Sequence, residues 1–206
     1  MLALLLGAAC RGDGFRPDAT PIVPSPRPSP SASPSPTPPL DPSPEPRDLT
    51  YAFPLRPSSV ADYSQGHHDY PATDIFAPLG TRFVATTSGV VDELSRHDRW
   101  DPSVDDPATR GGLYVSLIGD DGVRYYGAHL SSVASGLRAG ERVERGQLLG
   151  RVGDSGNARG ISPHLHFGIS HPTFPGDWEV RRGEVDPYSY LEAWRRGRDR
   201  TPVLER

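Results

Sequence analysis

Apolar positions fall in short runs from residue 51 onwards, and glycine-containing turns such as 119–122 separate these runs. Short runs rich in β-branched and aromatic residues, bounded by turn residues, predict β-strands. Helical spacing is limited to a turn near 130–135 and a segment at 188–196. The pattern predicts a mainly β fold of stacked antiparallel sheets, in a sandwich or a barrel. The predicted strands cover residues 83–86, 89–94, 113–118, 123–129, 147–152 and 164–169.

A polar stretch interrupts the predicted strands between Arg96 and Arg110. It contains several aspartates, prolines and Trp100, and it has no apolar periodicity. Loops of this length inside a compact domain are often functional. We therefore expect this loop to form a wall of a substrate groove.

The first 50 residues differ in composition from the rest of the chain. Residues 2–9 form an apolar run that is too short to cross a bilayer, which needs roughly 20 apolar residues, and they resemble the core of a secretory signal. Small residues followed by Cys10 resemble a bacterial lipoprotein signal, with an ordinary signal and an incidental cysteine as the alternative. Residues 11–50 are rich in proline and serine and predict a disordered, stiff linker.

These differences predict four regions in the chain. We expect a signal segment at 1–10, a linker at 11–50, a globular domain at 51–195 and a solvated, Arg-rich tail at 196–206. The 206 residues suffice for one domain with such appendages.

Charge and rare residues exclude several classes of function. The net charge of −4 gives no basic surface for nucleic acid. The segment 140–150 resembles a biotin or lipoyl carrier domain, but such carriers need a lysine and all 22 basic residues here are arginines. The single cysteine excludes an intrachain disulfide and a multi-cysteine metal site.

Two histidines share one face of the predicted strand at 164–169. Side chains alternate along a strand, so His164 and His166 look into one space while Leu165 and Phe167 face the core. Imidazoles placed in this way serve as metal ligands or as bases. Taken alone, the pair also fits two half-exposed surface histidines.

Other residues of the same chemistry lie close to predicted strand ends. His67, His68 and Asp74 come just before a predicted strand, and His129 ends the strand at 123–129. Zinc hydrolases hold their metal through three protein ligands from histidine and acidic residues, and they leave a fourth position for water. Two histidines and one aspartate meet that requirement and leave other histidines for proton transfer.

At this point the chain resembles the lysostaphin-type, or LytM-like, zinc peptidoglycan endopeptidases, over residues 51–190. The resemblance lies in HHDYPATD with the following IFAPLGTRFVATTSGVV, in YYGAHLSSV, and in LRAGERVERGQLLGRVGDSGNARGISPHLHFGI. It implies a barrel-sandwich, or duplicated hybrid motif, fold with Zn²⁺ held in a groove between loops.

The resemblance also implies a role for each site residue. Asp74 and His166 would be metal ligands, and His129 and His164 the two catalytic histidines. The commonest family spacing has three residues between the first histidine ligand and the aspartate, whereas six follow His67 here. Family variants with a Tyr-Pro-Ala insertion favour His67 as the third ligand, with His68 as the alternative.

The implied function is a zinc metalloendopeptidase that hydrolyses peptide bonds of bacterial peptidoglycan. The alternative is an inactive or weak LytM-like regulator that binds the wall or activates another wall hydrolase. We expect an exported, extracytoplasmic monomer that faces the cell wall and is anchored to the membrane by a lipid on Cys10. The resemblance leaves open which peptidoglycan bond is cut.

Several remaining motifs have simpler explanations. Gly153-Asp154-Ser155-Gly156 resembles the nucleophile motif of serine proteases, but it lies where the resembled family has a glycine-rich turn. His97 and His171 are expected at the surface. The tryptophans fit core packing or loop anchoring, with stacking on sugars as the alternative; they are Trp100, Trp178 and Trp194.

Overall fold

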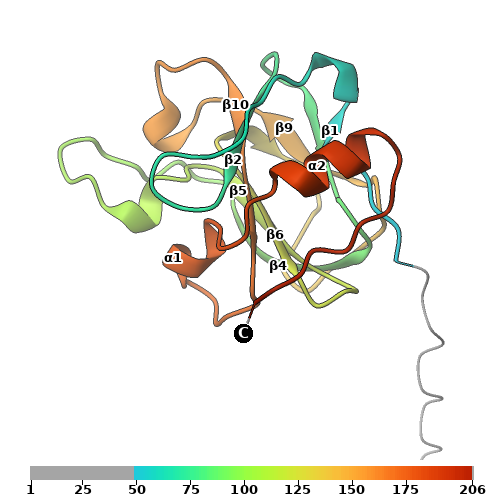
Figure 1. Cartoon of the computed structure of the whole chain (residues 1–206). Helices are drawn as coiled ribbons and strands as arrows, with labels where there is room; N and C mark the ends of the chain where they lie inside the picture. Colours follow the sequence, from blue (N-terminus) through green and yellow to red (C-terminus); the bar gives the residue numbers. More distant parts are fainter. Residues whose placement is uncertain (1–48, 206) are drawn as a thin grey trace, which may run out of the picture. The chain divides into compact units, whose positions relative to one another are not determined.

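The structure is a computed structural model, and it describes residues 49–205 (Figure 1). The predictions on the signal segment 1–10, on Cys10 and on nearly all of the linker at 11–50 therefore fall outside the described residues. Within 49–205, none of the helices has the length and apolar character needed to cross a bilayer.

Two antiparallel sheets make up the domain, as the apolar pattern predicted. In the larger sheet the strand order is β2 (Thr73–Phe76), β10 (His164–Ser170), β6 (Arg124–Ala128), β5 (Tyr114–Gly119), β4 (Gly89–Ser95) and β8 (Arg142–Val143). In the smaller sheet the order is β1 (Leu55–Arg56), β3 (Arg82–Val84), β9 (Leu148–Val152) and β7 (Leu130–Val133). The helices are short: α1 (Trp178–Arg181), α2 (Tyr188–Arg195), and the 3-10 turns η1 (Ser58–Val60), η2 (Pro107–Thr109) and η3 (Gly156–Ala158).

The predicted strands and the helix at 188–196 are all present, but two local predictions were wrong. Asp74 lies inside β2 rather than before a strand. The expected helical turn at 130–135 is strand β7, whose register against β9 shifts between Leu130 and Ser132. This irregularity buries Leu130 and Val133 and exposes the two serines between them, which mimics the spacing of a helix.

The core lies between the facing sides of the two sheets. Phe83 of β3, Leu165 of β10 and Phe167 of β10 are almost completely buried in one apolar cluster. Gly127 of β6 allows the close approach, because a Cβ there would lie 2.4 Å from the Phe83 ring. Each fully buried side chain of this size stabilises the fold by about 1.5–3 kcal/mol. The core therefore holds β10 rigidly from its inner face.

The C-terminal segment packs against the domain more closely than a solvated tail would. Trp194 of α2 is buried and stacks on Tyr51, with 5.4 Å between ring centroids. Beyond α2, the Asp199 carboxylate accepts a hydrogen bond from the Tyr51 backbone N–H, and Leu204 packs on the core. Residues 196–201 are exposed, as expected for an Arg-rich end.

Candidate metal centre and its pocket

A pocket of about 600 Å³ opens where the outer face of β10 meets four connecting segments. Figure 1 shows the loop between β4 and β5, the loop before β2 and the turn before β10 gathered on the same side of the sheets. The predicted loop at 96–110 does supply a wall, through Pro107, Ala108 and Arg110. The other lining segments come from residues 67–70, 157–161 and 178–182.

The alternation predicted for β10 is present in the structure. Leu165 and Phe167 are fully buried in the core, whereas His164 and His166 line the pocket on the opposite face. Pairing with β2 places His166 directly opposite Asp74. The fold thus brings residues 92 positions apart into one polar cluster.

Three potential metal-ligating side chains converge at this point, and we call them the metal cluster: His67, Asp74 and His166. Their donor atoms all lie within 4.8 Å of one another. His166 Nδ1 is 2.9 Å from Asp74 Oδ1, and His67 Nε2 is 3.7 Å from Asp74 Oδ2. His68 lines the pocket but is exposed and outside this group. The geometry therefore groups His67 with Asp74 and His166, while its role as a ligand stays a prediction.

The hydrogen bonds of His166 suggest that a cation fits the metal cluster. Its Nε2 lies 3.0 Å from the backbone carbonyl oxygen of Arg182, which can only accept, so Nε2 carries the hydrogen. The Nδ1 lone pair of the neutral ring then faces the Asp74 carboxylate. Two acceptors at this distance are favourable only with a proton or a metal ion between them. The buried Nδ1 of His67 also has no hydrogen-bond partner among residues 49–205.

The protonation of the metal cluster also suits a metal. Burial alone would raise the pKa of Asp74. When a proton lies between Asp74 and His166, the hydrogen bond and charge of His166, with the other nearby histidines, outweigh burial and lower the pKa of Asp74 to about 2. Burial, together with His166, lowers the pKa of His67. At neutral pH the group therefore offers an anionic oxygen and a neutral imidazole, the forms that ligate zinc.

The carbonyl of Arg182 reaches His166 because two glycines leave room for it. A Cβ on Gly168, two residues beyond His166 on the same face of β10, would lie 2.3 Å from the Arg182 carbonyl oxygen. Gly183 has φ 142°, and a Cβ there would lie 2.1 Å from the Pro71 carbonyl oxygen. Sequence reasoning missed this contact, whose only sequence signal is a glycine near each partner.

His129 lies where the chain passes from β6 in the larger sheet to β7 in the smaller one. It adopts φ 60°, in the left-handed region that is rare for residues other than glycine. Its ring centroid is 4.9 Å from that of His164 and 6.0 Å from that of His166. Burial lowers the pKa of His129 to about 3, so the imidazole is neutral under ordinary conditions.

Both candidate catalytic histidines present the same nitrogen to the pocket. Nδ1 of His129 is 2.8 Å from the Ser155 carbonyl oxygen, and Nδ1 of His164 is 2.9 Å from the Ser162 carbonyl oxygen. A carbonyl only accepts, so each Nδ1 carries a hydrogen, and in the neutral form of each ring the lone pair lies on Nε2. Each Nε2 is therefore a proton acceptor.

The serine-protease motif is structural. Ser155 Oγ donates to the Leu130 carbonyl and accepts from the Leu113 N–H, and His129 contacts the Ser155 carbonyl rather than its hydroxyl. These bonds leave no nucleophile aimed at a base.

Other candidate residues also have simple roles. His97 is exposed as predicted, and His171 pairs with Glu184 away from the pocket lining. Trp194 belongs to the core and Trp178 lines the pocket. Trp100 is half-buried beside the Arg159 guanidinium.

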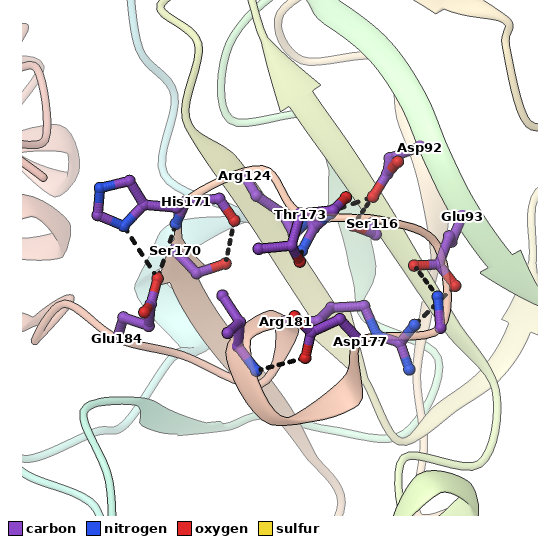
Figure 2. Close-up of polar contacts among 12 residues, drawn as sticks. Asp92, Glu93, Ser116, Arg124, Ser170, His171, Thr173, Asp177, Arg181 and Glu184 are labelled. Atoms are coloured by element: carbon purple, nitrogen blue, oxygen red, sulfur yellow. Dashed lines mark hydrogen bonds and ion pairs between the residues drawn. The ribbon is translucent and has the colours of Figure 1, made fainter.

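The segment after β10 is held against the larger sheet by a second polar cluster, the arginine network, shown in Figure 2. Arg124 of β6, fully buried, lies 3.1 Å from the Asp92 carboxylate and donates to the Thr173 hydroxyl and carbonyl. Arg181 of α1 donates to Glu93 at 2.7 Å, and its guanidinium lies over the Tyr114 ring. A shift in register of β4 between Val91 and Glu93 accompanies this pair of carboxylates. The members are Asp92, Glu93, Arg124, Thr173 and Arg181.

Comparisons with known proteins agree with this fold. Residues 68–186 match the profile of peptidase family M23. The L-Ala--D-Glu endopeptidase of Bacillus subtilis is 33% identical over 136 residues, which cover 64% of this chain but only 37% of that protein.

Two solved structures illustrate the likeness in fold. One is a putative glycyl-glycine endopeptidase LytM from Ruminococcus gnavus, with 27% identity and a TM-score of 0.55, over 73% of this chain and 62% of that chain. The other is a putative peptidase M23 from Pseudomonas aeruginosa, with 23% identity and a TM-score of 0.50, over 71% of this chain and 52% of that chain. The second likeness concerns the fold alone.

Proposed function

The chain belongs to peptidase family M23, and from this premise we propose that it is a zinc metalloendopeptidase that hydrolyses peptide bonds of peptidoglycan. The observation that carries the proposal is the convergence of the metal cluster within 4.8 Å, in a pocket that also contains two further histidines. His67, Asp74 and His166 would hold the zinc, and His129 and His164 would be the catalytic pair. His68 is the alternative to His67 as the third ligand.

The chemistry combines a metal with two imidazoles. When bound, zinc lowers the pKa of a water ligand and polarises the scissile carbonyl. His164 Nε2 accepts the proton of the attacking water and returns it to the leaving amine. His129 Nε2 also carries a lone pair, so this residue accepts a hydrogen bond from the water and orients it. The hydrogen bonds at Nδ1 fix both rings in this tautomer.

A regulatory protein without catalysis is less well supported. Such a member would need to lack ligands or bases, whereas every position that the resemblance assigns a role is filled here. All of these side chains also line a single pocket.

The cellular setting follows from the sequence and from the relative's name. The Bacillus subtilis relative is named as an L-Ala--D-Glu endopeptidase, which supports a peptidoglycan peptide as the substrate. The signal-like residues 2–9, Cys10 and the linker support an exported monomer anchored by a lipid, which acts outside the cytoplasm on the wall.

Digestion of purified peptidoglycan by the zinc-loaded full chain tests this function. Mass spectrometry of the soluble fragments should reveal new amino and carboxyl termini at one peptide bond. A chelator should abolish the release, and added zinc should restore it. A folded chain that binds no zinc and releases no fragments would overturn the proposal and favour the regulator.

A further inference from the structure

Arg182 differs from the other arginines that line the pocket. Arg110 is paired with Asp105 and Arg181 with Glu93, each at 2.7 Å. The half-buried Arg182 side chain makes no hydrogen bond and no ion pair with any described residue, and its buried Nε has no partner. Its positive charge is therefore available to pair with an anionic group of a ligand that enters the pocket.

Two aromatic rings hold this guanidinium in place. Its central carbon lies 4.0 Å from the Tyr70 ring centroid and 5.2 Å from that of Trp178. Stacking of this kind stabilises a guanidinium without using its N–H donors. The Tyr70 ring itself lies 5.8 Å from the His166 ring and 4.4 Å from the His67 ring. One aromatic ring thus separates the free cation from the metal cluster.

The backbone of Arg182 is fixed from two sides. Its carbonyl accepts a hydrogen bond from His166. The preceding Arg181 donates a hydrogen bond to Glu93 on β4 (Figure 2). Arg124 holds Thr173 earlier in the same segment. The Arg182 side chain therefore starts from a rigid anchor and needs little further ordering to bind a ligand.

The opposite side of the pocket is apolar. Phe76 pairs in register with His164, with 5.2 Å between the ring centroids, and is 39% exposed. Ile161, which also lines the pocket, is 53% exposed. Residues i and i+2 of a strand lie about 7 Å apart, so the apolar rim flanks His164 while the cation flanks His166. This asymmetry suits a peptide with a carboxylate on one side of the scissile bond and a small apolar group on the other.

We propose that Arg182 binds a free carboxylate of the substrate beside the scissile bond, so that the enzyme selects acidic stem peptides over glycine bridges. The proposal rests on the proposed function, because it assigns a subsite to the same pocket. Arg182 suits this role because a guanidinium and a carboxylate form two parallel hydrogen bonds. Asp69 also lines the pocket, but it is exposed and forms no ion pair with Arg182 within the described residues.

The test compares two synthetic stem peptides that are identical except at one position, where one has a D-glutamate with its free α-carboxylate and the other has the amide. The zinc-loaded full chain should cleave the acid with a kcat/KM at least roughly tenfold higher, the range of a charge-assisted hydrogen bond. Arg182→Gln should reduce this preference to about onefold, mainly through KM, with unchanged zinc content. Arg182→Lys should keep an intermediate preference, because it retains the charge but loses the planar fork.

Arg110→Gln is the matched control, because Arg110 lines the same pocket and is half-buried like Arg182, but it is already paired with Asp105. It should keep the preference for the acid. Equal cleavage of acid and amide by the unmodified chain, or an unchanged preference in both Arg182 variants, would overturn the subsite and leave the proposed function standing. Cleavage of neither peptide nor purified wall by the zinc-loaded chain would overturn the proposed function itself.

Discussion

The metal cluster and the arginine network are both built on the larger sheet, yet they balance their charges in opposite ways. In the arginine network each buried guanidinium faces a carboxylate, Arg124 with Asp92 and Arg181 with Glu93. In the metal cluster the Asp74 oxygens face imidazole nitrogens, and His67 Nδ1 has no hydrogen-bond partner in the part of the chain that the structure describes. Paired opposite charges hold a segment in place, whereas metal-ligating atoms that have no positively charged partner are suited to bind a cation.

The largest expected effect comes from removal of His166 from the metal cluster. His166→Ala removes the nitrogen that faces Asp74, and we expect zinc content and wall hydrolysis to fall to background. Zinc content of the purified chain and fragment release measure the two effects. His171→Ala, which removes an imidazole paired with Glu184 outside the pocket, should leave both unchanged. Full zinc loading of the His166 variant would contradict this assignment.

Removal of the proposed base His164 should lower the catalytic rate without lowering the zinc content. His164→Ala should keep zinc at full occupancy but lower kcat by on the order of 10²- to 10⁴-fold, the range of general-base catalysis. Steady-state kinetics on wall fragments, with zinc content measured in the same sample, checks this. Loss of zinc together with rate would place His164 among the ligands instead.

In the arginine network we expect a cost in stability. Glu93→Ala leaves the Arg181 guanidinium buried without its carboxylate, and such a break costs about 3–5 kcal/mol of unfolding free energy. Urea unfolding measures the loss. Glu93→Leu combined with Arg181→Met should recover much of it, because apolar replacement of both partners of a buried pair is often neutral. If the double variant is no more stable than Glu93→Ala, the cost of Glu93→Ala does not come from the unpaired charge of Arg181.

A smaller effect is expected at the Arg182 carbonyl. This carbonyl links the arginine network to the metal cluster, because it follows Arg181 in the chain and accepts a hydrogen bond from His166. Gly168→Ala would push this carbonyl away from His166 Nε2, and loss of such an orienting hydrogen bond typically costs about 10- to 100-fold in metal affinity. Competition with a chromophoric chelator measures the affinity. The control is Gly136→Ala, which faces open space at φ 82° and should cost about 1 kcal/mol of backbone strain without weakening zinc binding. Equal zinc affinity in the two variants would show that the Arg182 carbonyl does not orient His166 for zinc binding.

The effect that is smallest at neutral pH concerns the acid stability of the zinc-free chain. Burial lowers the pKa of His129 to about 3, below the value near 6.5 of an unfolded histidine. The unfolded state therefore binds the proton first, and stability falls as pH drops from about 6.5 towards 3, by at most about 1.4 kcal/mol per pH unit. Urea unfolding at several pH values should reveal this slope, and His129→Gln should reduce it. An unchanged slope in that variant would assign it to other groups.

The sequence predicted the β layers and the face shared by His164 and His166, because a period of two is a local property of one strand. It also pointed to Asp74 and His129 through the family resemblance. The grouping of His67 rather than His68 with Asp74 depends on how the irregular loop before β2 turns, which no periodicity describes. The contact between Arg182 and His166, and the pairing of Arg124 with Asp92, join distant segments whose approach becomes evident only in the folded chain.

The peptide unit at Arg182 has a consequence for how this enzyme can evolve. Its main chain accepts a hydrogen bond from His166, the proposed metal ligand, while its side chain makes no hydrogen bond or ion pair with any described residue. Any residue compatible with the local backbone supplies the same carbonyl, so mutation at this position leaves the metal chemistry intact and alters only what the pocket recognises. New substrate preferences are therefore accessible through single codon changes here, without an inactive intermediate.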